Sequence, residues 1–148
     1  MERITVRVPA TTANLAAGFD TLGCALTLYN TLSFEKSEAL SFTGCDEAYR
    51  NTDNLAYQGF TCVFDHIGQP VPAVHIDIRA DIPVSRGLGS SAALLAAGAT
   101  AANQMSGAGL SADTLIALTT EWWSNPLRFP TRKIRSVSAS RMKTTMEI

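Results

Sequence analysis

One stretch of the sequence reads Pro83-Val84-Ser85-Arg86-Gly87-Leu88-Gly89-Ser90-Ser91-Ala92-Ala93, and it joins an alternating, strand-like segment to an alanine-rich helix. Its two closely spaced glycines allow backbone conformations that a side chain would forbid, and they let the backbone approach a ligand closely. The helix that begins at the two serines presents unpaired N–H groups and the positive end of its dipole. Such a place attracts phosphate groups.

The stretch allows two interpretations, a phosphate-binding loop and an ordinary turn before a helix. It is not a Walker A loop, because the sequence Gly-x-x-x-x-Gly-Lys-[Ser/Thr] is missing. A tight strand-to-helix turn with a serine N-cap needs only one glycine and one serine, so a glycine-rich turn alone would not decide between the two. Gly87, Gly89, Ser90 and Ser91 together exceed that need, and the whole string favours phosphate binding.

The composition is that of one ordinary globular domain. The chain has 148 residues, of which 46% are hydrophobic, and this is enough for a single core. The net charge of −1 gives no sign of a nucleic-acid partner, and the sequence contains neither an apolar run of membrane-spanning length nor a charged-then-apolar leader. We therefore expect a cytoplasmic protein without nucleic-acid or membrane partners. Cys24, Cys45 and Cys62 fit neither a disulfide framework nor a metal site, and we expect them to be buried small hydrophobes.

The even charge balance hides a change of composition after Glu121. Residues 1–121 contain 6 Lys/Arg and 12 Asp/Glu, a net charge of −6, whereas residues 122–148 contain 6 Lys/Arg and 1 Glu, a net charge of +5. Regular apolar spacing also stops after Pro126. We therefore expect a domain at 1–121 and an atypical, disordered basic tail at 122–148.

Apolar spacing predicts strands early in the chain and helices late, which is typical of an α+β layer arrangement. Pro9 is expected to end the first strand, an irregularity is expected near Asn30, and the polar residues 10–23 predict a ligand-facing loop. Asp53 or Asn54 is expected to cap the first helix. The predicted strands are 4–8, 24–36, 40–43 and 74–78, and the predicted helices are 54–67, 90–105 and 111–118.

Two further segments resemble a known family. Residues 8–23 read Val-Pro-Ala-Thr-Thr-Ala-Asn-Leu-Ala-Ala-Gly-Phe-Asp-Thr-Leu-Gly, and residues 52–57 read Thr-Asp-Asn-Leu-Ala-Tyr. Together with the loop at 83–93, they resemble the GHMP kinase superfamily over residues 1–121, and the segment 8–23 resembles the N-terminal signature of homoserine kinase. The resemblance implies a GHMP kinase N-terminal domain, a two-layer sandwich of a mixed β-sheet with helices on one face. It also implies ATP-dependent phosphorylation of L-homoserine to O-phospho-L-homoserine in threonine biosynthesis.

The resemblance further implies that the chain binds ATP and Mg²⁺. Ser91 would supply a hydroxyl ligand for Mg²⁺, and Glu121 is the candidate carboxylate ligand, although an ordinary solvated residue at a helix end explains Glu121 equally well. Asn54 would lie near the adenine, but helix capping is an equal alternative. The residues that would hold the phosphates are Pro83, Ser85, Arg86, Gly87, Leu88, Gly89, Ser90, Ser91 and Ala92.

By the same resemblance, Asn14 and Asp20 would contact the amino acid substrate at the catalytic centre. A carboxylate suits the substrate ammonium group, and an amide can donate and accept hydrogen bonds at once. Turn capping is the alternative explanation for both residues. Whether Asp20 also acts as a base stays open, although the resemblance favours substrate binding without a dedicated base.

The stretch after Glu121 departs from the homoserine kinase pattern. A segment of the Gly-His-Pro-Asp-Asn type and a second domain would follow in the family, whereas residues 122–130 here read Trp-Trp-Ser-Asn-Pro-Leu-Arg-Phe-Pro. We hypothesise that residues 122–148 arise from a shifted reading frame or a truncation, that the C-terminal GHMP domain is absent, and that the chain has low activity. A mevalonate-pathway type of GHMP kinase, a non-catalytic nucleotide-binding fragment and a structural module stay open as alternatives. The sequence does not fix the oligomeric state, and a homodimer is compatible with it.

Overall fold

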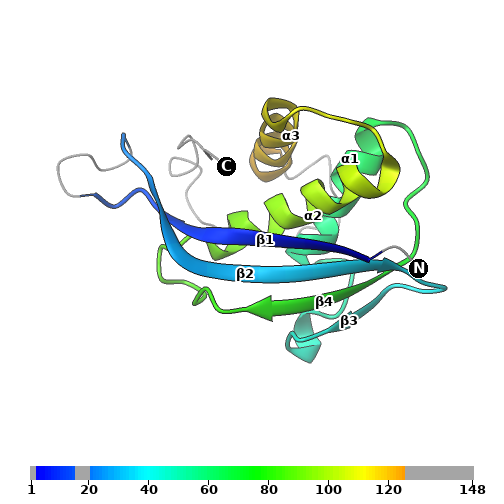
Figure 1. Cartoon of the computed structure of the whole chain (residues 1–148), viewed down its shortest axis with the longest axis horizontal. Coiled ribbons are helices and arrows are strands. Elements are labelled where there is room, and N and C mark those ends of the chain that lie inside the picture. Colours follow the sequence, from blue (N-terminus) through cyan, green and yellow to red (C-terminus); the bar gives the residue numbers. More distant parts are fainter. Residues whose placement is uncertain (1–2, 16–20, 126–148) are drawn as a thin grey trace.

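The computed structural model describes residues 3–15 and 21–125, in which a sheet is covered on one face by helices (Figure 1). The predicted α+β sandwich with a mixed sheet is confirmed. In chain order the elements are β1 (Arg3–Thr12), β2 (Cys24–Lys36), β3 (Ser41–Thr43), the 3-10 helix η2 (Glu47–Tyr49), α1 (Leu55–His66), β4 (Val74–Ala80), α2 (Ser90–Ser106) and α3 (Ala112–Ser124).

The sheet has the strand order β1-β2-β4-β3. β2 pairs antiparallel with both β1 and β4, and β3 pairs parallel with β4. Apolar residues alternate along these strands, so that one face carries the core, in which Leu32, Phe34 and Ile76 are fully buried. The opposite face carries polar pairs, such as the hydrogen-bonded hydroxyls of Thr5 and Ser33.

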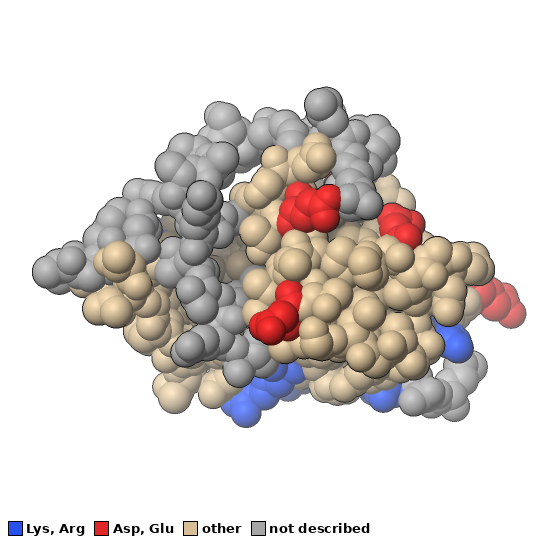
Figure 2. Space-filling model, turned by 90° about the horizontal axis from the view of Figure 1, so that it is seen from above, with Lys and Arg blue, Asp and Glu red and all other residues tan. Residues whose placement is uncertain are grey.

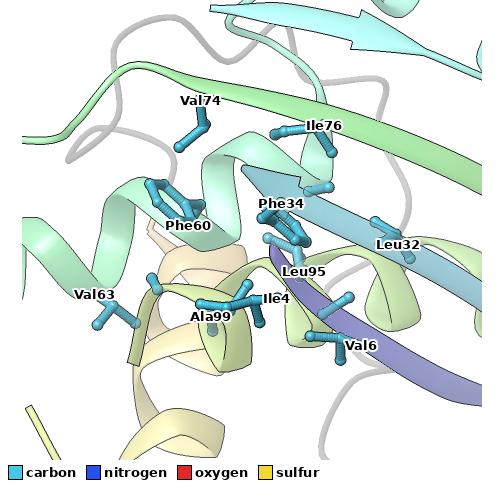
Figure 3. Packing of buried hydrophobic residues seen from close by; sticks show 14 of the residues in the cluster. Ile4, Val6, Leu32, Phe34, Phe60, Val63, Val74, Ile76, Leu95 and Ala99 are labelled. Carbon is cyan, nitrogen blue, oxygen red and sulfur yellow. The ribbon is translucent and has the colours of Figure 1, made fainter. Parts of the chain in front are cut away.

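Two glycines let the backbones of α1 and α2 touch where the helices cross. A Cβ atom on Gly59 would lie 2.1 Å from the Leu95 carbonyl oxygen, and one on Gly98 would lie 1.9 Å from the Ala56 carbonyl oxygen. The close crossing presses α1 against the sheet, where the Phe60 ring stacks on the Phe34 ring of β2 at 5.7 Å between centroids (Figure 3). α2 is therefore buried on most sides. As a separate finding, no helix within residues 3–15 and 21–125 has the length and apolarity needed to cross a bilayer.

The predicted boundary after Glu121 is wrong for the residues that follow it directly. α3 continues to Ser124, and Trp122 is only 3% exposed. The Trp122 indole N–H donates a hydrogen bond to the buried Gln58 side chain of α1 (3.2 Å), which ties α3 to the core. Trp122 thus belongs to the folded domain by packing. Residues 126–148 lie outside the described residues, so the disorder of that tail stays a prediction.

The first strand does not end at Pro9 but runs on to Thr12. β1 is an edge strand that pairs only with β2, so the missing N–H of Pro9 costs no interior ladder bond. The register shifts between Pro9 and Ala10, where the partner changes from Tyr29 to Leu26. This bulge confirms the irregularity predicted near Asn30, and it brings the first residues of the predicted loop 10–23 into the sheet.

We expect Gly98→Ala to destabilise the protein, although alanine normally favours a helix over glycine by about 1 kcal/mol. The added Cβ would overlap the Ala56 carbonyl, and overpacking of this kind costs about 1–3 kcal/mol. The measurement is the free energy of unfolding in urea. Ala96→Ser, which adds one atom at a half-buried position of the same helix, is the control and should change it by less than about 1 kcal/mol. A Gly98→Ala variant more stable than wild type would contradict the close crossing.

The expectation of buried cysteines holds for Cys62 and is wrong for Cys24. Cys24 is exposed at the start of β2, Cys45 is half-buried, and Cys62 is buried in α1. The Cys62 thiol donates a hydrogen bond to the Gly59 carbonyl (3.1 Å). Burial, with a smaller contribution from the nearby Asp65 carboxylate, raises the pKa of Cys62 from its usual 9.0 to about 12.

A thiol-specific reagent at pH 8.5 should therefore modify Cys24 rapidly and Cys62 only after unfolding, because the thiolate is the reactive form. The raised pKa of Cys62 also makes the stability of the protein depend on pH in the alkaline range. The stability due to the protonated Cys62 is fully present below pH 9, and it is lost as the pH rises toward about 12, since only the unfolded thiol ionises in that window. Cys62→Ala should flatten the fall in unfolding midpoint over this range. Timed labelling followed by mass spectrometry of peptides measures the difference in reactivity between Cys24 and Cys62. Equal labelling of the two thiols would contradict the predicted difference.

Candidate functional site

The loop of residues 81–89 runs from the end of β4 to the start of α2, beside the end of β1 (Figure 1). Three of its residues have a left-handed backbone: Ser85 (φ 60°), Gly87 (φ 70°) and Gly89 (φ 73°). Glycine adopts this conformation without strain, and serine seldom does. The alternation of left-handed and ordinary residues folds the loop tightly over the beginning of the helix.

The N-cap of α2 is Gly89, not a serine. The first helical hydrogen bond runs from the Ala93 N–H to the Gly89 carbonyl (2.9 Å), so the N–H groups of Ser90, Ser91 and Ala92 have no helical acceptor. Within residues 3–15 and 21–125, neither serine hydroxyl makes a hydrogen bond, and both side chains are half-buried. The serines are therefore not used for capping, and the end of the helix offers amide and hydroxyl donors to an anion.

Thr11 of β1 fixes the position of the loop. Its N–H donates a hydrogen bond to the Leu88 carbonyl (3.0 Å). A Cβ atom on Gly89 would lie 2.5 Å from the Thr11 hydroxyl oxygen. These contacts make Thr11 part of the site, although our sequence analysis did not single it out. The only sign in the sequence is its place inside the segment 8–23.

Asn14 lies over the same loop, and its contact with substrate stays a prediction. A Cβ atom on Gly87 would lie 3.2 Å from the Asn14 side-chain nitrogen, so the amide is in near contact with the loop backbone. The Asn14 N–H donates to the Thr12 hydroxyl (3.2 Å), which turns the chain after β1. The segments 8–23 and 83–93 therefore meet in space. Asp20, the other predicted substrate residue, lies outside the described residues.

The charges around the loop are sparse. Arg86 is exposed in the loop and forms no ion pair with any residue in the described part of the chain, so its guanidinium is available to an anion. Seen from the helix side, described Asp and Glu side chains lie apart from one another, and Lys and Arg appear at the rim (Figure 2). Residues 3–15 and 21–125 contain no cluster of three His, Cys, Asp or Glu residues. A cation there would depend on a hydroxyl, a single carboxylate and oxygens of its ligand.

Asn54 acts as a helix cap. It is 4% exposed, its Oδ1 accepts from the Ala56 N–H (2.9 Å), and its Nδ2 donates to the Tyr49 carbonyl (2.9 Å). The capping alternative is thus confirmed, and the adenine contact stays a prediction. Glu121, the predicted metal carboxylate, is exposed near the end of α3.

The chain is similar in sequence to one family of known proteins. Residues 54–124 match the family described as GHMP kinases N terminal domain. The chain is 44% identical over 124 residues to the homoserine kinase of Clostridium botulinum (strain 657 / Type Ba4), and the alignment covers 83% of this chain and 42% of that protein. The chain thus spans less than half the length of this relative.

Solved structures show the same fold. The crystal structure of homoserine kinase from Cytophaga hutchinsonii matches with a TM-score of 0.70 at 28% identity, over 82% of this chain and 42% of that one. The Methanococcus jannaschii mevalonate kinase matches with a TM-score of 0.64 at 18% identity, over 82% and 46% of the two chains, which shows likeness of fold alone. The resemblance to homoserine kinases predicted from the motifs is confirmed, and the fold is that of a GHMP kinase N-terminal domain.

Two left-handed glycines at the ends of α2 allow a matched test of the contact with Thr11. Gly89→Ala places a Cβ 2.5 Å from the Thr11 hydroxyl, whereas Gly107→Ala, at a similar φ of 67°, places its Cβ in open space. Both substitutions should cost about 1 kcal/mol of backbone strain, and Gly89→Ala should cost about 1–3 kcal/mol more because of the overlap. Urea unfolding measures the difference. Thr11→Ala in the Gly89→Ala background should recover part of it, and equal costs at the two glycines would show that Thr11 does not hold the loop.

Proposed function

We propose that this chain binds the phosphates of ATP at the start of α2 and takes part in phosphoryl transfer to L-homoserine, as the N-terminal part of a homoserine kinase. The observation that carries the proposal is the start of α2, where three N–H groups have no helical acceptor and two serine hydroxyls have no hydrogen bond to the described residues, next to the loop that Asn14 approaches. The 44% identity to a homoserine kinase supports homoserine as the acceptor. A cytoplasmic location is part of the proposal.

Phosphoryl transfer depends on positioning and on neutralising charge more than on covalent chemistry of the protein. In the proposed complex, the N–H groups of Ser90, Ser91 and Ala92 donate to phosphate oxygens, and the Arg86 guanidinium adds a positive charge from the exposed side. These donors are fixed before the ligand arrives, because α2 is buried against the sheet and α1. Little reorganisation is then needed when charge develops on the transferred group.

The donors fit Mg²⁺ in chemical type. The Ser91 hydroxyl makes no hydrogen bond within residues 3–15 and 21–125, and a hard oxygen is the ligand that Mg²⁺ prefers. Ser91 would hold the ion together with the phosphates, and Glu121 is the candidate carboxylate. When bound, the ion would neutralise phosphate charge.

The substrate side of the proposal rests on Asn14. Its amide lies in near contact with Gly87, so a hydroxyl acceptor that it orients would stand next to the bound phosphates. Orientation of this kind can supply a large part of a rate enhancement. We propose Asp20 as the partner of the substrate ammonium group.

Binding of Mg·ATPγS to the whole chain, measured by calorimetry with and without magnesium, tests the nucleotide site. We expect one nucleotide per chain and weaker binding without the metal. Homoserine, and not mevalonate, should stimulate ADP release from Mg·ATP in a coupled assay, at the low rate that we expect of a chain spanning 42% of its relative. Nucleotide binding without stimulation by homoserine would support only the ATP site, and absence of nucleotide binding would refute the proposal.

Asn14→Ala should lower kcat/KM for homoserine at least about tenfold while changing the ATPγS dissociation constant less than about threefold, because the amide faces the acceptor and not the helix end. Asn51→Ala is the matched control, since Asn51 is an exposed asparagine that hydrogen-bonds its own turn through the Ala48 carbonyl (2.9 Å). Equal kinetic effects of the two substitutions would contradict the role of Asn14.

A further inference from the structure

Asn30 is a buried polar residue below the phosphate loop that none of the motifs includes. It lies in β2, paired with Val8 of β1 and with Ala80, the last residue of β4. Its exposed fraction is 0%. The Asn30 Oδ1 accepts a hydrogen bond from the N–H of Ile82 (2.9 Å), two residues beyond the end of β4. The side chain therefore holds the loop backbone at the point where it leaves the sheet.

The nitrogen of the Asn30 side-chain amide, in contrast to the oxygen, makes no hydrogen bond with the described residues. This atom, Nδ2, is buried. A buried amide N–H without an acceptor is unfavourable, and an apolar side chain of similar size would avoid the loss. Asn103 offers a contrast, because it holds the loop after α2 with both groups: its Nδ2 donates to the Leu110 carbonyl (2.9 Å), and its Oδ1 accepts from the Leu110 N–H (2.9 Å).

The hydrogen bond between Asn30 and Ile82 is linked by side-chain packing to the N–H groups at the start of α2. Ile82 is buried in a small apolar cluster with Ala10 of β1 and Ala93 of the first turn of α2, and Leu88 packs against the same cluster. Leu88 is also the residue whose carbonyl is held by the N–H of Thr11 (3.0 Å). A shift of Ile82 would therefore move both the end of the loop and the beginning of the helix.

We propose that Asn30 is a positioning residue for the phosphate site. It supplies an uncharged acceptor at a buried place where the loop needs one, and its unpartnered Nδ2 is the cost of having that acceptor there. It acts through Ile82 and touches no ligand. The part of the proposal that concerns nucleotide affinity rests on the proposed function, whereas the part that concerns the loop does not.

The test compares Asn30→Leu with Asn103→Leu in the whole chain. Amide hydrogen exchange without nucleotide reports on the loop, calorimetry with Mg·ATPγS reports on affinity, and thermal unfolding reports on stability. Asn30→Leu should speed exchange at Ile82 and at Thr11 and Ala93, whose N–H groups donate to the Leu88 and Gly89 carbonyls, at least about tenfold, and it should raise the dissociation constant about tenfold, the value expected from losing one anchoring hydrogen bond. Asn103→Leu should lower the unfolding midpoint and leave loop exchange and affinity unchanged.

Asn30→Asp separates the acceptor from general packing. It keeps an oxygen for the Ile82 N–H but buries a carboxyl group, so the unfolding midpoint should fall while loop exchange stays within about threefold of wild type. Unchanged loop exchange in Asn30→Leu, or loss of loop protection in folded Asn30→Asp, would overturn the proposal, and the second result decides the matter if Asn30→Leu does not fold. A wild-type chain that fails to bind Mg·ATPγS would refute the proposed function, while the exchange data would still decide the role of Asn30.

Discussion

The contact of Gly89 with Thr11 determines where α2 begins and in which direction its free N–H groups point. Gly89 combines a left-handed backbone with a distance that leaves no room for a side chain, so two separate requirements select glycine at one position. Because Thr11 also binds the Leu88 carbonyl, the loop cannot move along β1 without losing a hydrogen bond. The start of α2 is thus held by an edge strand of the sheet, just after the register shift between Pro9 and Ala10.

The same helix forms part of the core and of the proposed binding site. α2 crosses α1 with backbones in contact through Gly59 and Gly98, and its buried alanines lie between α1 and the sheet. A helix held in this way cannot tilt to follow a ligand, which suits an anion site that depends on prepared donors. We expect this arrangement to link stability to binding, because a change in the helix crossing at Gly98 would also shift the first residues of α2. Loop residues 81–88 are held by two hydrogen bonds, one at the Ile82 N–H and one at the Leu88 carbonyl.

Local signals in the sequence predicted most of the fold, and long-range contacts explain what they missed. Alternation predicted the strands, Asn54 caps the first helix as expected, and the last helix starts where the predicted range 111–118 begins. The end of the first strand was misjudged because an edge position, which removes the penalty on Pro9, is a property of the sheet order. The boundary after Glu121 was misjudged because the bond from Trp122 to Gln58 joins residues that are 64 positions apart. In the site, the glycines and serines were evident as a motif, whereas Thr11 and Asn30 act through contacts that no periodicity reveals.

The segments 8–23 and 83–93 meet in space, and this affects how an acceptor would be aligned. β1 holds the proposed phosphate loop at Thr11 and, after a turn made by Thr12, places the Asn14 amide near Gly87. The residue that fixes the donor site and the residue proposed to orient the acceptor therefore belong to one short run of backbone. Their separation is limited by the short chain between them and by the hydrogen bond from the Asn14 N–H to the Thr12 hydroxyl. Catalysis of phosphoryl transfer rests on positioning together with electrostatic stabilisation, and a short connection between the two residues would serve the positioning part.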